Sequence, residues 1–152
     1  MKNIYKNKKA YFEYEILEKF EAGIVLKGSE VKSIREGKIN FIDSYCEISD
    51  SEIYCKGLHI SQYKDASYNN DDPLRNRKLL LNKKEINKIA ARIKERGLSC
   101  VPLSVYFNKR NFVKMEIGLG RGKRLYDKRE KIKKNDVRME NSAASKIKNI
   151  KL

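Results

Sequence analysis

Apolar and polar residues stop alternating at Gly118–Leu119, and a basic segment follows. The run Gly-Leu-Gly-Arg-Gly-Lys-Arg-Leu-Tyr-Asp-Lys-Arg-Glu begins at Gly118. Residues 121–152 contain 12 Lys and Arg against 4 Asp and Glu, so more than half of the net charge of +15 lies on the last fifth of the chain. This segment has too few large apolar side chains for a core. We therefore expect residues 1–120 to form the folded body and residues 121–152 to be disordered alone.

Size and charge limit the possible classes of protein. A chain of 152 residues with 40% hydrophobic residues can bury one modest core, which favours a single domain. The positive charge indicates a polyanionic partner, either a nucleic acid or an anionic membrane surface, although AT-rich codon usage could also enrich Lys, Asn and Ile. No apolar stretch exceeds three residues, so we expect a cytoplasmic protein with no membrane partner.

The cysteines argue against a disulfide framework and against a zinc site. Cys46, Cys55 and Cys100 are odd in number and show no C-x-x-C spacing. We expect buried thiols that act as small apolar side chains, and we expect neither a metal nor a cofactor.

Periodicity predicts six strands, two helices and one long loop. Residues 1–9 are polar and basic, which predicts a mobile arm. Period-two alternation and turn residues predict strands at 12–16, 22–26, 44–49, 52–60, 101–107 and 113–119, the last two forming a β-hairpin. Ser29 as an N-cap predicts a short helix to Glu36, and Asn82 with Glu85 resembles a capping box that opens a helix ending at Gly97. The polar stretch 61–77 is typical of a loop.

About six strands, with a helix between the early and late groups, favour a small OB-like antiparallel β-barrel over a sandwich. The expected fold class is therefore mainly β, with two or three helices and a basic C-terminal tail. Such barrels commonly bind oligonucleotides, but the fold alone supports that function only by analogy.

Seven short runs, in order and at compatible spacing, resemble the SmpB family of tmRNA-binding proteins of bacterial trans-translation. The runs are Asn7–Ala10, Phe20–Gly23, Gly28–Ser33, Asp43–Tyr45, His59–Ser61, Arg75–Leu81 and Gly122–Arg129. The resemblance extends from Asn7 to about Lys133. It weakens in the far tail, where Ala144 and Ser145 stand in place of an apolar pair.

The resemblance implies a non-enzymatic, monomeric factor that grips the tRNA-like domain of tmRNA. It further implies delivery with elongation factor Tu, which binds the aminoacylated tmRNA, to a stalled ribosome. The positions that match tmRNA contacts are Asn7, Lys8, Glu21, Leu81 and Lys114. The positions that match contacts with ribosomal RNA and the small-subunit decoding centre are Arg121, Lys123, Arg124, Tyr126, Asp127, Lys128 and Arg129.

Spacing in the tail also predicts a helix on the ribosome, where the tail would enter the mRNA channel. A helix would gather one narrow apolar stripe that consists of Leu125, Ile132, Met139, Ala143, Ile147 and Ile150. Such a stripe is too small to hold a helix in water, but an RNA-walled channel could stabilise it by neutralising the surrounding charge.

Several alternatives remain open from the residues alone. Leu81 could be a core residue at the entry of a helix, and Tyr126 could be the last core aromatic. A generic OB-fold RNA chaperone or ribosomal protein would explain the charge, but not the ordered short runs. A small metal-dependent nuclease could use His59 with Asp43 or Glu30, although lone histidines on strands are more often structural. Gly118 to Lys123 lacks the spacing and the hydroxyl residue of a phosphate-binding loop.

Overall fold

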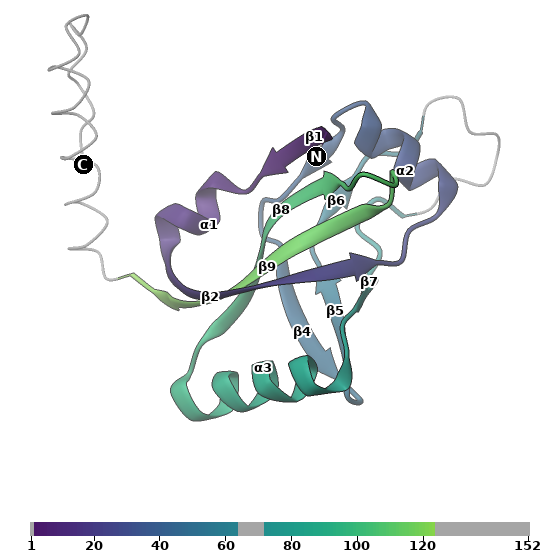
Figure 1. The fold of residues 1–152 in the computed structure, drawn as a ribbon. Coiled ribbons are helices and arrows are strands. Elements are labelled where there is room, and N and C mark those ends of the chain that lie inside the picture. Colours follow the sequence, from purple (N-terminus) through teal and green to yellow (C-terminus); the bar gives the residue numbers. More distant parts are fainter. Residues whose placement is uncertain (1, 64–71, 124–152) are drawn as a thin grey trace, which may run out of the picture.

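A computed structural model describes residues 2–63 and 72–123 of the chain (Figure 1). The far part of the predicted tail lies outside these residues. The expectations for Arg124, Tyr126, Asp127, Lys128 and Arg129, and the expected tail helix, therefore concern residues that the structure does not describe.

The described chain is mainly β, as the sequence predicts. Its strands are β1 (Lys2–Lys6), β2 (Tyr14–Ile24), β3 (Ile39–Asn40), β4 (Tyr45–Ser49), β5 (Glu52–Lys56), β6 (His59–Ile60), β7 (Arg77–Leu80), β8 (Ser99–Phe107) and β9 (Val113–Gly122). Its helices are α1 (Lys8–Glu13), α2 (Gly28–Arg35) and α3 (Lys83–Arg96). Seven strands form one antiparallel sheet in the order β1-β8-β9-β2-β7-β5-β4, and β3 pairs with β6 separately.

The large sheet curls but does not close by hydrogen bonds. Strands β1 and β4 are its two edges, and β4 contacts β8, which is not its neighbour in the sheet. Helix α3 lies across one end of the curled sheet, and α2 lies near the opposite end (Figure 1). The expectation of an OB-like antiparallel architecture is thus confirmed in its broad form, as a partly closed sheet.

The core fills the inside of this curl. It includes Ile53 from β5, Leu79 from β7, Met115 and Ile117 from β9, and Ile89 from α3, each almost fully buried. The three thiols are also buried and free, as the sequence predicts, and Cys46 lies opposite Cys55 on the neighbouring strand. Hydrogen bonding to Cys100, then to Cys55, together with burial, raises the pKa of the Cys46 thiol, which keeps this thiol uncharged.

The predicted mobile arm over residues 1–9 is wrong for the described part of it. Strand β1 pairs with the outer edge of β8, and Asn7 then caps α1 by accepting a hydrogen bond from the Ala10 amide at 3.2 Å. Ala10 packs with Val101 and Leu103 in a small second cluster. The edge of β8 offers backbone partners that do not depend on side-chain type, so the polar sequence gives no sign of this strand.

Two strand predictions merge into one, because β2 runs without interruption from Tyr14 to Ile24. Phe12 and Glu13, predicted to begin a strand, belong instead to α1. The predicted strand 52–60 is divided at Gly57, whose φ is 75°. A Cβ at Gly57 would lie 2.5 Å from the Asp43 carbonyl oxygen, so the chain needs glycine at this turn.

The helix and hairpin predictions mostly hold. Helix α3 is capped by Asn82, which accepts from the Glu85 amide at 2.8 Å, and it ends at Gly97 with a left-handed φ of 64°. Strands β8 and β9 form the predicted hairpin. Helix α2 begins one residue before the predicted N-cap Ser29, with Lys27 in the cap position. Strand β7 begins at Arg77, the last residue of the predicted loop.

Candidate nucleic-acid interface

Four strands bring two of the predicted tmRNA-contacting residues, Glu21 and Lys114, onto one sheet face. Cross-strand pairing aligns Tyr106 with Lys114, Lys114 with Gly23, and Gly23 with Leu80, which makes one row across β8, β9, β2 and β7. The next row pairs Glu116 with Glu21. Directly paired residues of antiparallel strands point to the same face. The alternate residues of these strands are core residues, so both rows lie on the face opposite the core.

Glu21 has an exposed carboxylate that a buried tyrosine holds in place by a hydrogen bond. The Tyr106 hydroxyl donates a hydrogen bond to Glu21 Oε2, and Tyr106 itself is only 8% exposed. Burial, and then the neighbouring Glu21 carboxylate, raise the pKa of the Tyr106 hydroxyl, which therefore remains a donor. The arrangement fixes the carboxylate while leaving it open to accept hydrogen bonds from outside.

Lys114 lies beside an apolar hollow of about 280 Å³ at the end of these rows. Exposed apolar side chains gather there, since Leu80 is 53% exposed and Phe112 is 61% exposed. The hollow is lined by Gly23, Ile24, Leu26, Val31, Leu80, Asn111, Phe112, Val113 and Lys114. The Lys114 cation and the apolar surface of Leu80 and Phe112 therefore lie together, close to the Glu21 carboxylate.

The two leucines at the end of β7 have different environments. Leu81, the predicted contact, is half-buried and packs against the core next to the α3 cap. Leu80 is the exposed leucine, and it pairs with Gly23 on the candidate face. The sequence did not identify Leu80, because three consecutive leucines show no alternation that marks the outward one. The residue at which β7 begins would have identified it.

The predicted contacts at the start of α1 also differ from each other. Asn7 is buried, and its side-chain amide donates to the Pro102 carbonyl at 2.7 Å while its oxygen caps α1. Both polar ends of Asn7 are therefore used inside the protein. Lys8 is exposed at the first position of α1. Neither residue lies in the two rows that contain Glu21 and Lys114.

The root of the basic tail is attached to α1. The Lys123 backbone amide donates to the Glu13 carbonyl at 2.9 Å, and Lys123 Nζ donates to the Tyr11 carbonyl at 3.1 Å. Arg121 is still within β9, where its guanidinium lies 3.8 Å from Glu15 and remains largely exposed. The first two residues of the predicted tail, Arg121 and Gly122, therefore belong to the sheet.

Glu30, which sequence reasoning assigns mainly to structure, belongs to a buried ionic cluster. It accepts from Arg77 Nε at 2.8 Å, from Arg75 Nη2 at 2.6 Å, and from the Lys27 amide at 2.8 Å. Burial acts to raise the pKa of Glu30, but the hydrogen bonds from Arg75, the Lys27 amide and Arg77, together with the charge of Arg77, outweigh it, so the pKa is lowered. The carboxylate is a structural anion and is not free to act as a base.

The described residues give no support to the nuclease alternative. His59 is half-buried in β6, where it pairs with Asn40. Within residues 2–63 and 72–123, no three His, Cys, Asp or Glu side chains lie close enough together to hold a metal ion. Of the helices in the same ranges, none has the length and apolar character required to cross a bilayer.

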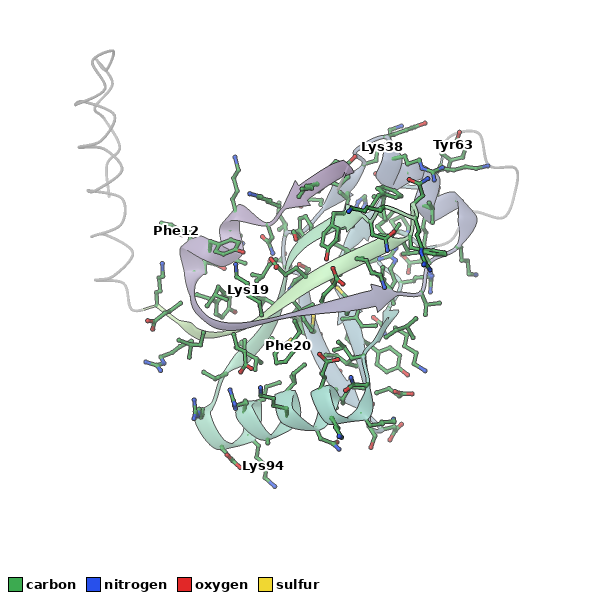
Figure 2. All side chains as sticks on the ribbon, in the orientation of Figure 1. Phe12, Lys19, Phe20, Lys38, Tyr63 and Lys94 are labelled. Atoms are coloured by element: carbon green, nitrogen blue, oxygen red, sulfur yellow. The ribbon has the colours of Figure 1, made fainter. Side chains whose placement is uncertain are left out.

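Charge is also distributed over α3, at the end of the molecule away from α2. Figure 2 shows Lys94 projecting from α3 away from the sheet, whereas Phe20 points from β2 toward α3. Lys88 Nζ lies 5.8 Å from the centre of the Phe20 ring, and Lys88 and Arg92 both pair with Glu18. The inner turns of α3 are therefore tied to β2, and Lys94 is an exposed cation outside the candidate face.

Known proteins closely resemble this chain over nearly its whole length. Residues 4–147 match the family model described as SmpB protein. The SsrA-binding protein of Syntrophobacter fumaroxidans is 55% identical over 137 residues, which cover 90% of this chain and 84% of that protein. The SsrA-binding protein of Geotalea uraniireducens is 53% identical over 148 residues, which cover 97% of each.

A solved structure described as "tmRNA-SmpB: a journey to the center of the bacterial ribosome" shares both fold and sequence with this chain. It matches with a TM-score of 0.69 and 47% identity, covering 90% of this chain and 95% of the other. The family model, the relatives and the fold agree with the ordered short runs in the sequence, and the chain therefore belongs to the SmpB family.

Proposed function

We propose that this protein binds the tRNA-like domain of tmRNA and delivers it to stalled ribosomes for trans-translation. The single observation that carries this proposal is the pair of rows on the sheet face, where Glu21 is fixed by Tyr106 beside Lys114. The names of its relatives, which are SsrA-binding proteins, support the same reading.

Each side chain has a chemistry suited to RNA. The Glu21 carboxylate can accept from base amino groups, and Lys114 can meet a phosphate. Leu80 offers an exposed apolar surface for a base or a sugar, a role that the half-buried Leu81 could fill only in part. Lys8 is a further candidate for a phosphate contact. Asn7 is better explained as a cap, since both ends of its amide are used inside the protein.

The proposed action is binding and delivery without chemistry on the RNA. A monomer would carry aminoacylated tmRNA together with elongation factor Tu, in the cytoplasm, where bacterial ribosomes work. Arg121 and Lys123 stand at the root of the tail, and we assign the tail, including Arg124, Tyr126, Asp127, Lys128 and Arg129, to the decoding centre and mRNA channel. The basic charge of residues 121–152 suits ribosomal RNA.

The test is a filter-binding titration of the full chain against a transcript of the tRNA-like domain. Lys114→Ala is expected to weaken binding roughly tenfold, because it removes a charge-assisted contact. Lys94→Ala removes the same charge from an exposed position on α3 and is expected to change affinity less than twofold. The affinity of Glu21→Gln is compared in the same way with that of Glu95→Gln. Glu95, like Lys94, is exposed on α3.

Circular dichroism spectra of all four variants should match that of the unaltered protein. Equal weakening by Lys94→Ala and Lys114→Ala would contradict the assignment of the face and would favour a generic RNA binder held by net charge. Loss of affinity that follows loss of fold would make Glu21 and Lys114 structural residues.

A further inference from the structure

Phe112 is the most exposed of the large apolar side chains in the described part of the chain, at 61%. It closes the turn between β8 and β9. A single exposed apolar side chain is ordinary, but Phe112 lies with the exposed Leu80 at one apolar hollow beside the candidate face. A contiguous apolar patch of this kind marks an interaction site.

The turn that carries Phe112 is held by hydrogen bonds. Asn108 Oδ1 accepts from the Arg110 amide and the Phe112 amide, each at 2.9 Å, and the Asn108 amide donates to the Phe112 carbonyl at 2.9 Å. Asn111 takes the left-handed conformation, with φ of 66°. The backbone below the ring is thus fixed before any partner arrives, which reduces the entropy lost on binding.

The surroundings of the ring suit a nucleotide. The hollow beside it, about 280 Å³, has apolar walls that include Leu26, Val31 and Leu80, and it has Lys114 at its border. None of the residues that line it is acidic. Lys109 and Arg110 are exposed on the turn itself. Ligand pockets for larger molecules occupy about 300–1,000 Å³, so this hollow fits one small planar group.

We propose that Phe112 stacks on an unpaired base of tmRNA, and that Lys114 pairs with a phosphate of the same or the adjoining nucleotide. Every base has a π-face, so stacking requires only an exposed aromatic ring and a cationic path for the backbone. Aromatic residues flanked by cations are typical of single-strand contacts. The inference rests on the proposed function and adds to it an unpaired base held by the hairpin turn.

Three substitutions of Phe112 separate stacking from apolar contact. In filter binding of the full chain to a full-length tmRNA transcript, Phe112→Ala and Phe112→Leu are both expected to weaken binding, by roughly 5- to 100-fold. Phe112→Tyr keeps the ring and is expected to stay within twofold. Ile42→Ala is the matched control, because Ile42 is 58% exposed, in the loop between β3 and β4. It should leave affinity unchanged.

A second measurement locates the base. Dimethyl sulfate footprinting of tmRNA with the unaltered protein should show an unpaired adenine or cytosine whose protection changes with Phe112→Leu and is retained with Phe112→Tyr. Full affinity and an unchanged footprint with Phe112→Leu would overturn the stacking inference. If at the same time Lys114→Ala still weakens binding, the proposed function stands. If the unaltered protein does not prefer tmRNA at all, the proposed function itself fails.

Discussion

Replacement of Arg77 by methionine should destabilise this protein more than any surface change of charge. The Arg77 side chain is 0% exposed, and it donates to Glu30, to the Leu58 carbonyl at 2.6 Å and to the Pro73 carbonyl at 3.0 Å. Methionine keeps much of the volume but removes the Arg77 donors from the Leu58 carbonyl and from the buried Glu30 carboxylate, whereas the Pro73 carbonyl still accepts from the Ile60 amide at 3.0 Å. Breaking a buried ion pair from one side reduces the free energy of unfolding by about 3–5 kcal/mol.

Arg75→Met provides the internal comparison, because Arg75 pairs with the same carboxylate but its side chain is 24% exposed. Water can replace part of what Arg75 donates, so we expect a smaller loss, about 1–2 kcal/mol. The assay is urea unfolding of each full-length variant, followed by circular dichroism and analysed with a common slope. A loss below 1 kcal/mol for Arg77→Met, or an equal loss for both variants, would refute this account of the cluster.

The same cluster predicts a dependence of stability on pH. The folded-state pKa of Glu30 lies below its ordinary value, so the folded protein binds fewer protons at this site than the unfolded chain. Its contribution is present above the unfolded pKa, about 4.3, and is lost as pH falls through the folded pKa. Between about pH 5 and about pH 3, the free energy of unfolding should therefore fall less for the Glu30→Gln variant than for the unaltered protein.

Three further outcomes follow from the charge, the tail and one turn. Affinity for tmRNA should fall by about 10³–10⁵ between 50 and 200 mM salt if six to ten phosphates are neutralised, by the duplex-DNA scale, and salt-independent binding would contradict this. Truncation after Arg124 should preserve tmRNA binding but abolish peptide transfer in a reconstituted stalled-ribosome assay; near-normal transfer would contradict the role of the tail. Gly57→Ala should lower the free energy of unfolding by more than about 1 kcal/mol, measured by urea unfolding, because of its φ of 75° and the 2.5 Å approach to Asp43.

The sequence predicts helices and strands well where the chemistry of their own side chains determines where they begin and end. Helix α3 carries a cap, a period of 3.6 residues and a terminal glycine, and the structure places it between the predicted ends. The hairpin of β8 and β9 alternates clearly on both sides of its turn. In each case, local preference and burial agree, so the pattern is sufficient.

The elements that the sequence misses are held by backbone partners or by distant residues. Strand β1 exists because the edge of β8 is free to pair, and β3 and β6 are two-residue strands that pair only with each other. The ionic cluster joins Glu30 to Arg77 across 47 positions of the chain, so spacing alone cannot reveal it. Similarly, Leu80 rather than Leu81 is the exposed leucine only because β7 pairs with β2 in this register.

The RNA that co-purifies with the full-length protein from bacteria with intact tmRNA tests the central proposal most directly. After a wash at moderate salt, sequencing of the bound RNA should return tmRNA as one dominant discrete species, and Lys114→Ala should reduce its share relative to Lys94→Ala. A mixture of RNAs in proportion to their cellular abundance would contradict the proposal and favour a generic RNA binder, and degraded RNA would favour a nuclease.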